Sequence, residues 1–207
     1  MKRIKIDLYA DISCPWCYIG CSSLNKAIKN KKSFKFDIYW RIFYLNPNIP
    51  ISGVDRNVYL NKKFGYEKNI IINQIIKVAK LEKIPIKLNN IHITPNTFFA
   101  QQLVKSLSKE DLAKGYDLAN ELMYDYFVNG KNLGNTNYLF SIFKKYTNIN
   151  PQKVISEIKD NFIDLDLVSQ NQISGVPVFI FNDQWTISGA QSSKVLENTI
   201  DLAGNDI

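Results

Sequence analysis

Histidine and cysteine, the side chains that most often bind transition metals, are scarce in this sequence. The chain has one histidine, His92, and three cysteines, Cys14, Cys17 and Cys21, which all fall between positions 14 and 21. A structural zinc site takes four such ligands, and a secreted disulfide framework needs more cysteines than this, spread along the chain. The sequence therefore predicts no metal site and no disulfide framework, and we expect no resident cofactor.

Long hydrophobic runs are missing as well. No stretch approaches the roughly 18 to 20 apolar residues that a transmembrane helix requires. Residues 1–12 have two early cations but neither the apolar core nor the small-residue cleavage site of a signal peptide. We expect a cytoplasmic protein with no membrane partner.

Acidic residues are in deficit, since 26 Lys and Arg stand against 19 Asp and Glu, for a formal net charge of +7. A clustered excess of this kind would suggest nucleic-acid binding. The basic residues look dispersed along the chain. Their densest group, Lys29, Lys31 and Lys32, fits the exposed C-terminal end of a helix, where cations suit the helix dipole. We expect no nucleic-acid partner.

What is present is the composition of a globular protein, with 45% hydrophobic and 22% charged residues over 207 positions. Alternating residues predict a strand over 3–10, and helical spacing predicts a helix over about 15–30. A second strand with one buried face follows from Phe34 to Trp40. The proline-containing run at 45–50 then takes the chain out of the sheet, so the N-terminal part predicts a β-α-β unit.

The middle of the chain, from about 55 to 172, has helix start signals and apolar residues at helical spacing, and it lacks the alternation typical of strands. Ser108 with Asp111 suggests a capping box for a helix that reaches Phe127. Asn150 followed by Pro151 marks another helix start. At least five helices fit this segment.

The end of the chain predicts a hairpin and a helix. Residues 178–181 and 185–188 are two short β-rich runs around a turn at 182–184. A last helix with apolar residues Val195, Leu196, Thr199, Ile200 and Leu202 follows, and Gly204 is well placed to end it.

The resulting order is strand, helix, strand, helical insertion, hairpin and helix. It predicts an α/β protein with a thioredoxin-like fold, in which a mixed sheet is flanked by helices, and with a long all-helical insertion. Residues 1–50 and 173–207 would form the thioredoxin-like domain, and residues 51–172 would form an insertion packed on it as a lid.

The chemistry points to the Cys14-Pro15-Trp16-Cys17 segment. At the join of a strand and a helix, Cys14 would lie where backbone amides and the helix dipole stabilise a thiolate, which lowers its pKa below about 8.5 and makes it a nucleophile. Cys17 lies one turn further on and can form a disulfide with Cys14, as the resolving thiol in an exchange cycle through a mixed disulfide. Pro15 and Trp16 would shape the turn around Cys14.

The remaining candidates have ordinary interpretations. Cys21 is expected to be a small buried helix residue, and His92 a loop or partly buried structural residue. Pro177, before the first hairpin strand, is by itself typical of a strand start, although its position after the insertion leaves a cis peptide open. Arg41 and Asn96 are more simply explained as solvated or capping residues than as catalytic ones.

Several segments together, in order along the chain, resemble the DsbA family and its FrnE-like branch. They are residues 11–20; Trp40-Arg41 with Phe43, Leu45 and Pro47; Asn96-Thr97; Tyr126-Phe127 with Gly130; Gly175-Val176-Pro177 with Phe179; and residues 188–191. The resemblance implies a protein disulfide oxidoreductase or isomerase that acts on protein or small-thiol substrates, with glutathione as a possible co-substrate. It also implies that Val176 and Pro177 form a cis-proline loop against the cysteine pair. The backbone of Val176 would pair with an extended substrate, and Pro177 would shape the groove and deny a metal ligand site.

Two other classes of function stay open. The related 2-hydroxychromene-2-carboxylate isomerases and kappa-class glutathione transferases typically have serine at the position of Cys14 and bind glutathione. A redox-inert binding or chaperone-like module could use the groove between lid and sheet. Retention of both cysteines argues against these classes, because an exposed thiolate of low pKa is an oxidation liability. The direction of the redox reaction depends on the reduction potential of the cysteine pair relative to that of its compartment. The sequence leaves this direction open.

Overall fold

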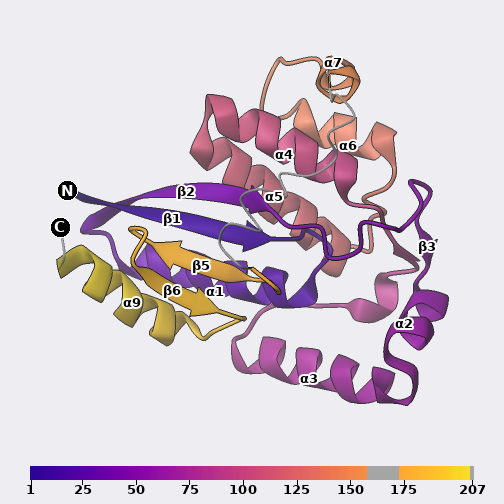
Figure 1. Cartoon of the computed structure of the whole chain (residues 1–207), viewed down its shortest axis with the longest axis horizontal. Coiled ribbons are helices and arrows are strands. Elements are labelled where there is room, and N and C mark those ends of the chain that lie inside the picture. Colours follow the sequence, from indigo (N-terminus) through magenta and orange to yellow (C-terminus); the bar gives the residue numbers. More distant parts are fainter. Residues whose placement is uncertain (158–172, 206–207) are drawn as a thin grey trace.

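The N-terminal β-α-β unit forms as the sequence predicts. A computed structural model of the chain, shown in Figure 1, describes residues 1–157 and 173–205. Strand β1 (Lys2–Ala10) is followed by helix α1 (Pro15–Asn30) and strand β2 (Phe34–Ile42), and β1 and β2 are parallel. A crossover helix is the usual connection between adjacent parallel strands.

The hairpin completes a mixed four-stranded sheet. Strand β5 (Val178–Phe181) pairs antiparallel with β1, and β6 (Trp185–Ser188) pairs antiparallel with β5, so the strand order is β2-β1-β5-β6. Asn182 and Asp183 in the turn have φ values of 49° and 59°. Asn and Asp tolerate this left-handed region better than most residues, and a tight hairpin turn requires it. The predicted hairpin is confirmed.

The core of the sheet includes the inner strand β1. Ile4, Ile6 and Leu8 alternate along β1 and are fully buried. Helix α9 (Ser193–Asn205) packs against both α1 and β1. Burial of such apolar side chains is the main source of stability for the sheet, at about 1.5 to 3 kcal/mol each.

The insertion is helical but not all-helical. Its α-helices within the described residues are α2 (Arg56–Phe64), α3 (Lys68–Leu81), α4 (Phe98–Glu110), α5 (Leu112–Phe127), α6 (Thr136–Phe143) and α7 (Pro151–Ser156), with short 3-10 helices at Gly65–Glu67 and Leu88–Asn90. The expectation of at least five helices is therefore confirmed, whereas its last predicted part, 158–172, lies outside the described residues. Strands β3 (Val54–Asp55) and β4 (Ile93–Thr94) pair antiparallel within the insertion. The prediction of an all-helical insertion is wrong, because a two-residue strand is too short to show alternation.

Two predicted helix boundaries also need correction. Asp111 caps α5, since its carboxylate accepts a hydrogen bond from the Lys114 backbone N–H at 3.1 Å, whereas Ser108 lies inside the preceding helix. Gly204 lies within α9 rather than after it. A Cβ at Gly204 would come within 2.4 Å of the Phe34 ring, so this glycine serves close packing and not helix termination.

The predicted start at Asn150 is confirmed, because its side chain caps α7.

The apolar face of α9 was only partly predicted. Leu196, Thr199 and Ile200 are buried as expected, but Val195 and Leu202 remain 38% and 47% exposed. Ala203, which the apolar pattern passed over, is fully buried.

A buried glutamine attaches the insertion to the sheet. Gln101 of α4 is fully buried and accepts a hydrogen bond from Trp40 Nε1 at 2.7 Å. Its amide nitrogen donates to the carbonyl oxygen of Ala10 at 3.2 Å and to that of Phe43 at 3.3 Å. Helix α4 is thereby held at the ends of β1 and β2, next to the start of α1. None of the helices in the described part of the chain is long and apolar enough to cross a membrane.

Candidate active site

The cysteine pair lies where the sequence predicts, at the join of β1 and α1. After β1 the chain turns, and the Cys14 backbone N–H donates to the Asp11 carbonyl oxygen at 3.1 Å. Cys14 is the N-cap residue of α1, with extended backbone angles, and Pro15 occupies the first helical turn. Proline suits this position because its missing N–H would have no partner there. The Cys14 side chain thus stands at the positive end of the helix dipole.

The Cys14 thiol faces the loop before β5. Its Sγ lies 3.9 Å from the Val176 carbonyl oxygen, to which the thiol donates. The residue is only 3% exposed, so the expectation of an exposed sulfur is wrong for this reduced form. The physical reason is the close approach of the Val176 loop, which the local sequence around Cys14 does not reveal.

The loop at Val176 has the conformation that the resemblance implies. The Val176–Pro177 peptide bond is cis, and Pro177 is buried. Gly20 of α1 makes the close contact possible, because a Cβ there would lie 3.0 Å from both the Pro177 ring and the Phe179 ring. Helix α1 therefore presses directly on the cis-proline loop.

Cys17 is fully buried behind Cys14. Burial raises the pKa of the Cys17 thiol well above its ordinary value, a hydrogen bond with Cys14 raises it further, and a hydrogen bond from the Asp11 backbone lowers it. A thiol whose pKa is raised in this way holds its proton more tightly than an exposed thiol does.

Cys21 is buried as predicted. Burial raises the pKa of the Cys21 thiol far above its ordinary value, and the nearby Cys14 raises it further. A thiol buried in this way is typical of a structural cysteine.

Asp11 is the residue whose part in the site the sequence analysis missed. The residue is 1% exposed, and its carboxylate accepts four hydrogen bonds. Oδ1 accepts from the Ser13 backbone at 2.7 Å and from the Ser13 hydroxyl at 2.9 Å. Oδ2 accepts from the Leu45 backbone at 2.8 Å and from the Thr97 hydroxyl at 3.3 Å. One carboxylate thus joins the active-site turn, the exit from β2 and the start of α4.

Burial raises the pKa of Asp11, and its four hydrogen bonds act in the opposite direction. The local signal for this role was an aspartate between the apolar residues Ala10 and Ile12, followed by a serine two positions on. An aspartate can accept from the backbone N–H two residues later in such a turn. Nothing local indicates that Leu45 and Thr97 also donate to it.

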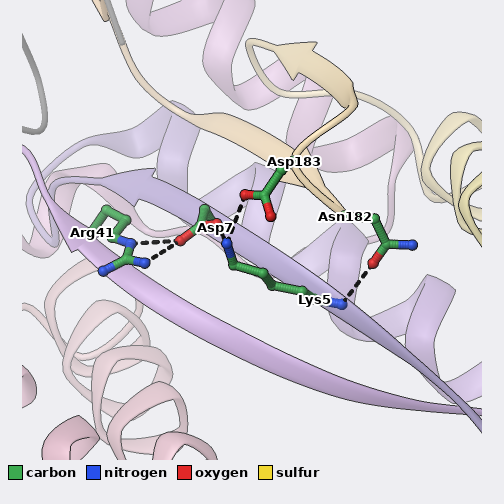
Figure 2. Close-up of polar contacts among 5 residues, drawn as sticks. All are labelled: Lys5, Asp7, Arg41, Asn182 and Asp183. Carbon is green, nitrogen blue, oxygen red and sulfur yellow. Dashed lines mark hydrogen bonds and ion pairs between the residues drawn. The ribbon is translucent and has the colours of Figure 1, made fainter. Parts of the chain in front are cut away.

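Arg41 lies within β2 and pairs with an aspartate, so its interpretation as a solvated or capping residue is wrong. Figure 2 shows that its guanidinium reaches Asp7 on β1, with Nε 2.6 Å from Oδ1. Asp7 also pairs with the Lys5 ammonium, which bonds to Asp183 at 2.6 Å, while the Lys5 backbone N–H donates to the Asn182 side chain. Two neighbouring strands and the hairpin turn are tied together by these contacts, and the charge of Arg41 is compensated within the sheet.

Asn96 makes hydrogen bonds to the backbone, and His92 lies in an exposed loop. The Asn96 side chain accepts from the Phe98 backbone at 2.8 Å and donates to the Ile49 carbonyl oxygen at 2.6 Å. His92 is an exposed loop residue. Across residues 1–157 and 173–205, no three His, Cys, Asp or Glu side chains come together as a metal site would require.

A thioredoxin-like sheet that carries a Cys-x-x-Cys pair at a helix start, with a cis-proline loop against it, defines the class of this protein. The family model described as the DSBA-like thioredoxin domain matches residues 5–201. The chain belongs to this family.

Solved structures with the same fold cover nearly the whole chain. A probable DsbA oxidoreductase from Streptomyces coelicolor is 19% identical, with a TM-score of 0.82 over 99% of this chain and 91% of that one. A 2-hydroxychromene-2-carboxylate isomerase is 14% identical, with a TM-score of 0.61 over 96% and 95%. The cytosolic disulfide reductase DsbM from Pseudomonas aeruginosa with GSH is 12% identical, with a TM-score of 0.57 over 96% and 95%.

One curated relative also matches along its length. It is an uncharacterized Bacillus subtilis protein, YwbO, which is 20% identical over 95% of this chain and 96% of its own.

Proposed function

We propose that this chain is a thiol-disulfide oxidoreductase of the FrnE-like branch, which exchanges disulfides with protein or small-thiol substrates through Cys14 and Cys17. The observation that carries the proposal is the position of the Cys14 sulfur. It lies at the N-terminus of α1, hydrogen-bonded to the Cys17 thiol and in contact with the Val176 carbonyl oxygen.

In the reducing direction, the Cys14 thiolate attacks one sulfur of a substrate disulfide. The substrate S–S bond breaks, a Cys14–substrate disulfide forms, and the first substrate sulfur leaves as a thiolate that takes up a proton. Cys17 then loses its proton and attacks the Cys14 sulfur, which releases the second substrate thiol. Two electrons pass to the substrate, and the Cys14–Cys17 disulfide remains. In the oxidising direction the same steps run backward.

The Val176 loop supports this cycle by exchanging hydrogen-bond partners. In the reduced protein the Val176 carbonyl oxygen accepts from the Cys14 thiol. Once Cys14 has lost its proton or joined a substrate, that carbonyl is released and can accept from the backbone of an extended substrate. Pro177 shapes the adjacent groove. Pro15 and Trp16, both half-buried, fix the turn around the sulfur.

The proposed partners are protein thiols and disulfides, with glutathione as a small co-substrate. Support for glutathione comes from a structural neighbour that was solved with GSH. That neighbour is named as cytosolic, and we propose the cytosol as the compartment in which this pair acts.

The likeness to a 2-hydroxychromene-2-carboxylate isomerase extends over the same length of chain. Two features favour exchange over isomerisation. Cysteine and not serine stands at the attacking position, and a second thiol is hydrogen-bonded to it.

Trapping the intermediate tests the proposal. In Cys17→Ala the resolving thiol is absent, so we expect a stable mixed disulfide at Cys14 after incubation with oxidised glutathione or a disulfide-linked peptide. Intact-mass and peptide mass spectrometry would detect it, and Cys21→Ala, which keeps both active thiols, should release the adduct as wild type does. Noncovalent glutathione binding without any adduct at Cys14 would instead favour the isomerase or transferase class.

A further inference from the structure

Positive charge is concentrated on one arm of the insertion. The arm consists of α2, the 3-10 helix Gly65–Glu67 and α3, and ends at position 83. It contains seven cations and two carboxylates, Glu67 and Glu82, for a net charge of +5 against +7 for the whole chain. The expectation of dispersed basic residues is therefore wrong. Lys62 and Lys63 lie in the last turn of α2, and Lys80 lies in the last turn of α3.

A groove is lined by residues of α2 and of the segment that follows β2. Figure 1 shows α2 to the right of the sheet. Its volume of about 680 Å³ is within the usual range for ligand sites. Apolar side chains from residues 45–50, together with Val54 and Val58, form its floor and walls, and Lys62 and Lys63 stand on one side. Val58 is 64% exposed, and none of the lining residues is acidic.

Neither groove lysine has an acidic partner within residues 1–157 and 173–205. Lys63 Nζ bonds to the Tyr59 hydroxyl at 2.7 Å and to the Asn46 side chain at 3.3 Å, and both groups are neutral. Lys62 is exposed and forms no ion pair with any described residue. By contrast, Lys31 and Lys145 elsewhere on the surface are paired with Asp201 and Glu121.

The groove is connected to the cysteine pair through Leu45. This residue lines the groove, and its backbone N–H donates to the Asp11 carboxylate at 2.8 Å. The Asp11 carbonyl oxygen in turn accepts from the Cys14 backbone N–H at 3.1 Å. Two hydrogen bonds thus separate the near wall of the groove from the nucleophile.

We propose that this groove binds an acidic segment of the polypeptide substrate, next to the substrate cysteine that reacts with Cys14. The inference rests on the proposed function and narrows its substrate class. Apolar walls accommodate the body of an extended peptide, and Lys62 and Lys63 compensate its carboxylates. Two ammonium groups without a carboxylate partner among the described residues, beside an apolar groove with no acidic lining, favour an anionic occupant over a neutral or basic one.

Peptide binding tests this without any redox step. Fluorescent ten-residue peptides, with serine in place of cysteine and flanked by either four Glu or four Gln, are titrated into the reduced protein at about 20 mM salt. We expect the Glu peptide to bind about three- to tenfold more tightly, as two solvent-exposed ion pairs would give. The preference should disappear near 1 M salt, because screening removes it.

Matched variants locate the preference. Lys62→Gln/Lys63→Gln should bind both peptides equally. Lys29→Gln/Lys32→Gln, which removes the same charge at the end of another helix, should keep the preference. Equal loss in both double variants would mean long-range charge alone and overturn the proposal. Tighter, Lys62- and Lys63-dependent binding of a single-stranded RNA decamer would overturn it in favour of a nucleic-acid partner.

The two proposals can fail separately. If Cys17→Ala traps substrates but shows no preference for acidic peptides, the groove assignment is wrong and the exchange chemistry stands. If the acidic preference holds and no mixed disulfide forms, the groove binds acidic peptides and the exchange chemistry is wrong.

Discussion

At the scale of single residues, the buried carboxyl of Asp11 holds together three segments that meet beside Cys14. Its donors come from the adjacent turn, from 34 positions away and from 86 positions away. An unpaired buried donor costs about 1 to 3 kcal/mol. In Asp11→Asn the amide NH₂ replaces one acceptor oxygen, so we expect a loss of stability of about that size at pH 7, measured by urea unfolding.

The pH dependence of the free energy of unfolding, compared between wild type and Asp11→Asn, is a sharper test. Burial raises the pKa of Asp11 above its ordinary value near 3.8, so the folded state binds the proton more tightly than the unfolded state. The Asp11 contribution to stability is then fully present below about pH 3.8 and is lost as the pH rises through the folded pKa. The free energy of unfolding of wild type minus that of Asp11→Asn should therefore increase as the pH falls toward 4. A difference that stays flat or decreases would contradict this account of the carboxyl.

Cys21 is expected to be chemically silent in the folded protein. Its thiol is buried and burial raises its pKa, so alkylation with iodoacetamide at pH 8 should modify Cys14 first and leave Cys21 intact until urea unfolds the chain. Peptide mapping after timed alkylation measures this. Cys21→Ala should keep disulfide exchange at the wild-type rate; a large loss would give Cys21 a part in the cycle.

At the scale of elements, α1 packs closely against Pro177 in the loop before β5 and against Phe179 in β5. In Gly20→Ala the new Cβ would meet Pro177 and Phe179 at 3.0 Å, and overpacking of this kind costs about 1 to 3 kcal/mol. We expect lower stability and slower exchange with peptide disulfides. Gly175→Ala in the same loop is a suitable control, because no atom lies within 4 Å of its added Cβ. Equal effects of the two substitutions would argue against a steric cause.

The elements with long, regular patterns could be predicted from the sequence, and the short or crowded ones could not. β1, α1 and the hairpin have clear periodicity or turn residues, and they form where expected. β3 and β4 have two residues each, which is too few for any period. Gly204 resembles a helix stop, but it serves the packing of Phe34 against α9, a contact made across the whole chain.

At the scale of the whole molecule, the order of motifs was enough to predict the fold and the family. The order of motifs could not predict the four hydrogen bonds accepted by Asp11 or the groove beside α2. Both depend on segments that are far apart in the sequence and meet only in the folded chain. The division of the chain at residues 50 and 173 into two domains stays a prediction. Hydrogen bonds from Gln101, and from Thr97 to Asp11, link the insertion to the sheet. The same links make α4 a support of the active-site turn.

The central claim is that Cys14 and Cys17 form a reversible redox pair that carries disulfide exchange. We would measure the redox state of wild type and Cys14→Ala in glutathione buffers of stepped potential, together with insulin reduction by each protein. Wild type should form a Cys14–Cys17 disulfide with a two-electron slope of about 30 mV per tenfold change in the ratio of oxidised to reduced protein, and Cys14→Ala should lose insulin reduction. Absence of that disulfide at every potential, with equal insulin reduction by both proteins, would contradict the account.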